Sequence, residues 1–363
     1  MSIILRNKNT KKFDFVPRCG NFNARHKVNL IDLKMNITIS EIAEKVGLSR
    51  ATVSKALNDK DDISPKTRKR IKKIAKEMGY SVNIAAQMLS IQKTKTIGVI
   101  VPFPQNPSVI ERMKGIQLEA LDAGYLSSMA FHDGNPENEI KQIKLLHGRV
   151  DGMIVTPFRQ SEELKKTLSL CGLPLVFMSE CLFGVEADYV GNDDEEAGRI
   201  AAMHLIEKGH VNIAYLGSTP DTYSDQKLLE GFKQASKSHL CDILPFWGCT
   251  NRISTLKNME AILRRKERIT AIFAFSDHTA LWAMDFFARK ELGSSERIAL
   301  VGCDDIEFSS MERISLTSIS QPNLEIGKQA AKMLLEHLIN PEEVMSSRRI
   351  IFPPTLKPRQ SSD

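Results

Sequence analysis

The sequence contains little that would support chemistry at a metal, a nucleotide or a membrane. Its six cysteines are scattered without a C-x-x-C pair or a histidine cluster, which argues against a zinc site or disulfide framework and fits a reducing compartment. No G-x-G-x-x-G, P-loop or H-E-x-x-H sequence occurs, so we expect neither a cofactor nor a metal. No apolar run approaches the roughly 20 residues of a membrane span, and residues 1–34 lack a signal peptide's apolar core. These absences predict a cytoplasmic protein with no membrane partner.

Positive charge is concentrated at the N-terminal end. Residues 1–34 and residues 35–93 each carry a net charge of +6, whereas the remainder carries −6. A polyanion would therefore be bound near the N-terminus. The length of 363 residues and the 42% hydrophobic content predict two or three folded domains.

Residues 38–58 read as two short helices joined by a tight turn. Thr38 and Glu41 fit a capping box, and Gly47 can end the first helix in a left-handed conformation. Apolar residues at helical spacing form one stripe on this helix: Ile39, Ile42, Ala43 and Val46. The pattern predicts a helix packed on a small core.

The second helix divides into two faces. Ser49 can cap it, and its inward residues are Val53, Ala56 and Leu57. The opposite face carries Arg50, Ala51, Ser54, Lys55 and Asn58. Two interpretations are open at this point: an ordinary amphipathic pair with a solvated polar face, or a helix-turn-helix that presents this face to a DNA major groove.

A third helix is predicted from Ser64 and Pro65, which supply an N-cap and a first-turn proline, to Gly79. Its inner face is Ile71, Ile74, Ala75 and Met78, and its outer face is Lys66, Arg68, Lys69, Lys72, Lys73 and Lys76. This basic face either neutralises phosphates or is merely solvated. Residues 80–90 form a helix-capable stretch too short to be stable alone.

From Ile97 the chain alternates apolar strands with amphipathic helices, beginning TIGVIVP, a helix near residues 108–123, YLSSMAF, a helix from about Glu137, and DGMIVTP. Later strands are LPLVFMS, NIAYLG, AIFAFS and IALVGC. This alternation indicates βαβ units and parallel sheets, and the length favours two similar lobes.

The order of these segments resembles the lactose- and galactose-repressor family of bacterial transcription regulators. The stretches that carry the resemblance include IAEKVGLSRATVSKALN, EMGYSVNIAAQML, VDGMIV, HLIEKGHVNIAYLG, FAFSDHTALWAM, LVGCDD and LTSISQP. The resemblance implies an all-α helix-turn-helix domain and a hinge helix, followed by a two-lobed, doubly wound α/β region like a periplasmic binding protein.

The residues and the resemblance together give four parts. Residues 1–34, basic and without clear periodicity, are expected to be a disordered extension, with Met35 as a competing translation start. Residues 35–79 are the DNA-binding domain, 80–94 the hinge helix and linker, and 95–358 the effector-binding and dimerisation region. Lobe 1 spans about 95–191 and 322–349, and lobe 2 about 192–321 and 350–358.

By this resemblance the protein is a homodimeric repressor of a palindromic operator, located at the nucleoid. Arg50, Ala51 and Lys55 would read base edges, and Leu89 would enter a minor-groove step, although it could instead pack on a lobe. The remaining DNA-contacting positions are Ser49, Thr52, Ser54, Asn58, Thr67, Arg68, Tyr80, Asn83 and Ala86.

The resemblance also implies a small, sugar-like effector in a cleft between the lobes. Asp277 is expected to bind ligand hydroxyls or amines, although an aspartate after a strand can also be a helix cap. The other implied effector positions are Phe103, Ser179, Asn192, Asp193, Lys227 and Gln321. The arginine common before the Gly-aromatic pair is replaced near Gly231 by Leu228, and Trp247 is either a substitute platform or a core residue.

Two other classes compete with a regulator. A solute-binding protein would share the two lobes, but the basic N-terminal region opposes it. A nucleotide-dependent α/β enzyme would need a phosphate loop, which the sequence lacks. We therefore expect no catalytic residues. The missing C-terminal leucine heptad favours a dimer over a tetramer.

Overall fold

The computed structural model describes residues 5–6, 13–14, 37–58, 62–80, 93–237, 239, 241–290, 298–342 and 346–363. The chain divides into two compact units, Met1–Gln87 and Met88–Asp363. Strands β1 (Leu5–Arg6) and β2 (Phe13–Asp14) pair antiparallel. The rest of the predicted extension and most of the predicted hinge, including Asn83, Ala86 and Leu89, lie outside the described residues. Among the helices that are described, none has the length and apolarity needed to span a membrane.

The first unit contains helices α1 (Ile39–Val46), α2 (Arg50–Leu57) and α3 (Pro65–Glu77). The predicted capping box is present, since Thr38 Oγ1 accepts the Glu41 N–H at 3.3 Å and Glu41 Oε2 accepts the Thr38 N–H at 2.7 Å. Gly47 has a φ of 69°, as the predicted left-handed cap requires. The three helices enclose one small core of Ile42, Ala43, Val46, Val53, Ala56, Ile71 and Ala75.

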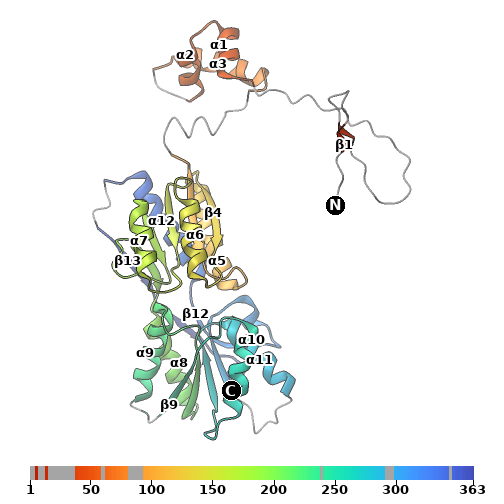
Figure 1. The fold of residues 1–363 in the computed structure, drawn as a ribbon, viewed down its shortest axis with the longest axis vertical. Coiled ribbons are helices and arrows are strands. Elements are labelled where there is room, and N and C mark those ends of the chain that lie inside the picture. Colours follow the sequence, from red (N-terminus) through yellow and green to blue (C-terminus); the bar gives the residue numbers. More distant parts are fainter. Residues whose placement is uncertain are drawn as a thin grey trace. The chain divides into compact units, whose positions relative to one another are not determined.

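The second unit contains two six-stranded sheets, each with helices on both faces (Figure 1). In lobe 1 the strand order is β13-β7-β6-β5-β3-β4, and all neighbours are parallel. These strands are β3 (Thr96–Val101), β4 (Leu126–Phe131), β5 (Gly152–Val155), β6 (Leu175–Met178), β7 (Asp188–Asn192) and β13 (Arg349–Phe352).

In lobe 2 the order of the described strands is β14-β12-β11-β10-β8-β9, in which β14 is antiparallel to β12 and the other neighbours are parallel. The strands are β8 (Asn212–Leu216), β9 (Asp242–Phe246), β10 (Ala271–Ala274), β11 (Ala299–Asp304), β12 (Thr317–Ser320) and β14 (Thr355–Lys357). Short 3-10 helices η2 (Glu307–Ser310) and η3 (Gln360–Ser362) follow β11 and β14. The predicted two-lobed α/β architecture is confirmed.

Each sheet is buried between two helix pairs. In lobe 1, α5 (Pro107–Asp122) and α12 (Asn323–Ile339) cover one face, and α6 (Pro136–Leu146) and α7 (Glu162–Cys171) cover the other. In lobe 2, α8 (Asp194–Glu207) and α9 (Tyr223–Lys237) lie opposite α10 (Arg252–Leu263) and α11 (Asp277–Lys290), as Figure 1 shows. Burial on both faces explains the nearly continuous apolar strands.

Helices α5 and α12 approach each other closely because glycine lies at their contact. A Cβ atom on Gly327 would lie 1.9 Å from the carbonyl oxygen of Arg112, and one on Gly115 would lie 2.2 Å from that of Leu324. Only a residue without a side chain allows this spacing. This contact fixes the position of the Arg112 backbone, from which its side chain extends.

The chain passes between the lobes after β7, after β12 and after β13. Because β13 pairs in register with β7, from Arg349↔Tyr189 to Phe352↔Asn192, residues 349–352 all belong to lobe 1. The boundary predicted after residue 349 is therefore too early. The last crossing falls at residues 353–354, both prolines, which cannot donate to a sheet ladder.

Candidate nucleic-acid interface and ligand cleft

Helix α2 separates its packing residues from its polar residues as predicted. Val53 and Ala56 are fully buried, whereas Arg50, Ala51 and Lys55 are exposed. Ser49 Oγ accepts the Thr52 N–H at 3.1 Å and so satisfies an amide of the first turn. The side of α2 opposite the core therefore presents a continuous row of polar and small side chains, which includes Ser49 and Asn58 as exposed residues and Thr52 and Ser54 as half-buried ones.

Lys55 and Asp62 form an ion pair between α2 and the residues that precede α3. Both side chains are 52% exposed, so the pair is weak and can exchange for another anion at little cost. A phosphate or a base acceptor could replace Asp62 as the partner of Lys55.

Helix α3 carries the basic face predicted for it. Ser64 Oγ accepts the Thr67 N–H at 3.3 Å, and an Arg68 Nη2 donates to the Ile63 carbonyl at 3.3 Å. Thr67 and Arg68 are half-buried, and Tyr80 packs against the core of this unit. The exposed basic residues are Lys66, Lys69, Arg70, Lys72, Lys73 and Lys76.

A cavity of about 130 Å³ lies between the two lobes of the second unit. Lobe 1 contributes side chains that follow β3, β5 and β6, and lobe 2 contributes side chains from the starts of α8 and α9 and the ends of β10 and β11. The carboxyl ends of parallel strands thus meet at the cleft, where open α/β sheets bind ligands. Ser179 and Asp304, which line the cavity, have positive φ angles of 66° and 118°. Two residues of the cavity wall therefore have strained backbone conformations.

Arg112 connects the parts of this cleft. Its Nε donates to Asn323 Oδ1 at 2.8 Å, its Nη1 to Ser179 Oγ at 2.7 Å, and its Nη2 to Gln321 Oε1 at 3.1 Å. The same Nη2 lies 3.8 Å from Asp304 Oδ1 in lobe 2. A buried guanidinium on α5 therefore contacts both lobes and one of the crossings between them.

Three carboxyl groups line the cavity with Arg112: Glu180, Asp194 and Asp304. Burial raises the pKa of Asp304 to about 7, with the Arg112 charge opposing that rise. Burial likewise raises the pKa of Asp194 to about 7 and that of Glu180 to about 8. The cleft thus holds several acids that are poorly stabilised as anions.

The structure places four of the seven predicted effector residues in the cavity wall: Phe103, Ser179, Asn192 and Gln321. Asp193, Lys227 and Asp277 do not line it. Asp193 is exposed and caps α8 by accepting the Glu196 N–H at 3.0 Å. Lys227 is engaged on the surface by Glu230 at 2.8 Å and Glu195 at 3.2 Å.

Asp277 is completely buried and holds lobe 2 together internally. Its Oδ2 accepts the Ile306 N–H at 2.9 Å and the Ser309 hydroxyl at 2.6 Å, and its Oδ1 accepts the Ser318 hydroxyl at 2.5 Å. Both carboxylate oxygens are therefore occupied by protein donors. We remove Asp193, Lys227 and Asp277 from the proposed effector contacts, since each is used elsewhere in the fold.

Sequence reasoning missed Arg112, Asp194 and Asp304 as cleft residues. Asp304 lies at the end of a predicted strand, the same signal that singled out Asp277, and Asp194 adjoins the predicted Asp193. Arg112 gives no such signal, because one arginine in an amphipathic helix normally points to solvent. Trp247 is half-buried, packs edge-on against Tyr215 at 5.7 Å between ring centroids and does not line the cavity, so it packs against the lobe 2 core and is not a ligand platform.

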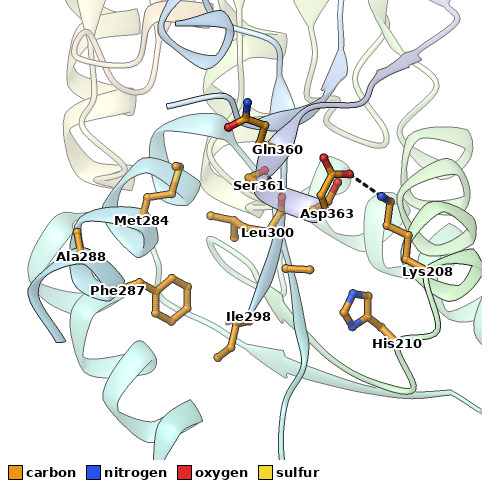
Figure 2. Close-up of a pocket in the computed structure, with 12 residues that line it drawn as sticks. Lys208, His210, Met284, Phe287, Ala288, Ile298, Leu300, Gln360, Ser361 and Asp363 are labelled. Atoms are coloured by element: carbon orange, nitrogen blue, oxygen red, sulfur yellow. Dashed lines mark hydrogen bonds and ion pairs between the residues drawn. The ribbon is translucent and has the colours of Figure 1, made fainter. Parts of the chain in front are cut away.

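A second hollow of about 700 Å³ lies at the end of lobe 2, between α11, β11 and the C-terminal residues (Figure 2). Figure 2 shows the Lys208 ammonium beside Asp363, 2.6 Å from its Oδ1. His210 Nδ1 and Thr270 Oγ1 are 2.9 Å apart. The polar groups of this hollow thus already have protein partners. We therefore take the smaller cavity between the lobes as the ligand site.

A helix-turn-helix unit joined to two lobes around a polar cleft defines a ligand-responsive DNA-binding protein. Residues 38–83 match the model described as "Bacterial regulatory proteins, lacI family", and residues 202–362 match that of a periplasmic binding protein-like domain. The chain belongs to the lacI family of bacterial transcriptional regulators.

Similar proteins extend over nearly the whole chain. The HTH-type transcriptional repressor PurR of Aliivibrio fischeri (strain MJ11) is 31% identical over 83% of this chain and 91% of its own length. A CelR–cellobiose complex is 25% identical with a TM-score of 0.66, covering 90% of this chain and 100% of its own. A Lac repressor dimer bound to operator and the anti-inducer ONPF has the same fold, with a TM-score of 0.77 at 23% identity, covering 90% and 99%. These relatives are named as transcriptional regulators, the class of protein that the sequence predicted.

Proposed function

We propose that this regulator is a repressor that binds a near-palindromic operator as a homodimer and responds to a small effector in the cleft. The observation that carries the proposal is the division of α2 into two sides. One side packs into the core of the domain, and the other leaves Arg50, Ala51 and Lys55 exposed. A regulator of this kind acts on the chromosome in the cytoplasm.

Direct base reading is assigned to the exposed row of α2. Arg50 and Lys55 can donate to guanine O6 and N7, and the methyl group of Ala51 leaves room for a base edge. We assign Ser49, Thr52, Ser54, Asn58, Thr67 and Arg68 to backbone positioning, because most lie at the caps and first turns of α2 and α3. Tyr80 joins this set, and Asn83, Ala86 and Leu89 remain predictions from sequence.

The homodimer is supported by apolar side chains on the outside of α5. Ile110, Leu118 and Leu121 are 46%, 43% and 64% exposed, and their spacing places them on one stripe of the helix. Such a stripe is typical of a surface that is covered by a partner. A second copy would present the same stripe, as a two-fold axis requires.

The effector site consists of Phe103, Arg112, Ser179, Asn192, Asp194, Asp304 and Gln321, which line the cavity from both lobes. A ligand held there changes the relative stability of lobe arrangements, and through them the affinity for operator. Effector and operator must then change each other's affinity by the same factor. A sugar or sugar derivative suits the polar wall and the three phenylalanines beside it, Phe103, Phe158 and Phe275.

The proposal can be tested by selecting genomic fragments with the purified full-length chain and footprinting the best one, beginning with the region upstream of its own gene. We expect two symmetric protected half-sites, a dimer by light scattering, and an affinity that falls steeply with salt. Protection of a single half-site, or no preference over competitor DNA, would contradict the proposal.

A further inference from the structure

The polar groups of the cleft are unevenly satisfied, because five of its hydroxyl groups donate to the protein while one buried acceptor, Asn192 Oδ1, has no donor among the described residues. The hydroxyl groups of Ser218 and Thr222 donate to Asp225, and that of Ser224 to the Ser179 carbonyl. Those of Thr156 and Ser276 donate to Met178 O and Thr279 Oγ1. These five hydroxyl groups therefore offer no hydrogen to a ligand in this arrangement.

Arg112 is used in the same way. Each of its three nitrogen atoms donates to a protein oxygen, on Asn323, Ser179 or Gln321. Among the described residues of the cavity wall, an anionic ligand would meet one cationic side chain, with three of its five N–H groups already used, and the carboxyl groups of Glu180, Asp194 and Asp304.

Asn192 supplies an independent sign that the site awaits a donor. Its side chain is 5% exposed and lines the cavity, and its Oδ1 accepts no hydrogen bond from the part of the chain that the structure describes. The orientation of the Asn192 amide follows from its neighbours. Arg112 can only donate, so its partner on Gln321 must be the oxygen Oε1, and the Asn192 atom 2.6 Å from that oxygen must be the donor Nδ2. A buried acceptor without a partner is costly unless a ligand donates to it.

We propose that the effector is a small hydroxylated compound carrying a protonated amine, of the amino-sugar class, whose ammonium group lies among Asn192, Asp194 and Asp304. An ammonium group has three donors and no acceptor, and its positive charge would stabilise the anionic forms of the buried carboxyl groups beside it. Phe103, Phe158 and Phe275 provide apolar surface for the carbon face of the sugar ring. The inference rests on the proposed function, because it names the ligand of the same cleft.

The test compares matched ligands on the full-length protein by calorimetry and thermal shift. Glucosamine, galactosamine and mannosamine are each measured against the neutral parent hexose, the N-acetyl derivative and the hexose 6-phosphate. We expect at least one amine to bind roughly tenfold or more tighter than its parent, a difference that one well-placed charge contact can supply. Tighter binding by the neutral or phosphorylated member, or no binding by any amine, overturns the proposal.

Variants locate the ammonium group. Asp304→Asn and Asp194→Asn should each reduce the preference for the amine over its parent, whereas Glu267→Gln, a change at an exposed acid in lobe 2, should leave that preference unaltered. An unreduced preference in both cleft variants contradicts the assigned position. The ratio measured in the unmodified protein does not depend on how well the variants fold.

Operator binding is measured on the same preparations. Operator binding with selection of the neutral sugar overturns only the ligand class. Amine binding without operator binding overturns the regulatory function and leaves the ligand class intact.

Discussion

The Glu180 carboxyl group of lobe 1 accepts the backbone N–H of Tyr223, the first residue of α9 in lobe 2, at a distance of 2.7 Å. The N–H of Ser224 donates to the same carboxyl group at 3.2 Å. The helix dipole of α9 and the donated N–H favour the anionic form of Glu180 across the boundary between the lobes, but they oppose the larger effect of burial, which raises its pKa. Arg349 of β13 adds a second link, since its Nη2 donates to Tyr223 Oη at 2.5 Å.

The first prediction concerns pH. Burial raises the pKa of Glu180 to about 8 and the pKa values of Asp194 and Asp304 to about 7, all above their unfolded values. Raised carboxyl pKa values contribute stability that is present at low pH and lost as pH rises through the folded pKa values. The melting temperature of the second unit should therefore fall as pH rises from about 4, near the unfolded pKa values, to about 8.

Glu180→Gln should flatten this dependence while keeping an acceptor for the α9 amides. Glu162→Gln, at an exposed residue of lobe 1, serves as the control and should retain the slope of the unmodified protein. Equal slopes in Glu180→Gln and the control would show that Glu180 does not contribute to the pH dependence.

The second prediction is that Arg112→Met destabilises the second unit by about 3 kcal/mol, because it leaves Asp304 without a cation and the acceptors on Asn323 and Ser179 without their donor. Urea unfolding measures the change. Arg289→Met removes an arginine whose side chain is 66% exposed, and should cost no more than about 0.5 kcal/mol. Similar losses in both variants would mean that the central position of Arg112 is unimportant.

The third prediction tests the helix contact behind the cleft. Gly327→Ala places a Cβ atom 1.9 Å from the Arg112 carbonyl oxygen, so α5 and α12 must separate. Overpacking of this kind costs about 1 to 3 kcal/mol, and it should also weaken effector binding by moving Arg112. Lys332→Ala on the exposed side of α12 is the matched control. Normal stability of Gly327→Ala would show that the helices adjust without loss.

The fourth prediction separates base reading from phosphate binding. Arg50→Ala should cost about 1 to 3 kcal/mol on the preferred operator and relax the preference at one base pair of each half-site. Lys66→Ala, on the exposed side of α3, should weaken binding to all sequences and lower the salt dependence by about one unit of slope. Fluorescence anisotropy on operator variants measures both, and an unchanged preference in Arg50→Ala would remove Arg50 from base reading.

Local patterns predicted the helix-turn-helix closely. The cap at Thr38, the turn at Gly47 and the inner faces of α1 and α2 depend on contacts within a few residues, so they can be recognised in the sequence. The apolar strands were equally clear because burial on both faces makes them continuous. Edge strands were harder: β9 contains Pro245, which its place at the edge of the sheet tolerates, and β13 and β14 alternate exposed and half-buried residues.

The sequence by itself determined the family resemblance, the helix-turn-helix and the two α/β lobes, because these follow from local motifs, residue spacing and chain order. Only the tertiary structure decided which carboxyl groups face the cleft. Asp277 and Asp304 both lie at the carboxyl ends of parallel strands, but protein donors occupy both oxygens of Asp277, whereas Asp304 lines the cavity beside Arg112. That difference depends on donors up to 41 residues distant in the chain, which no local pattern contains.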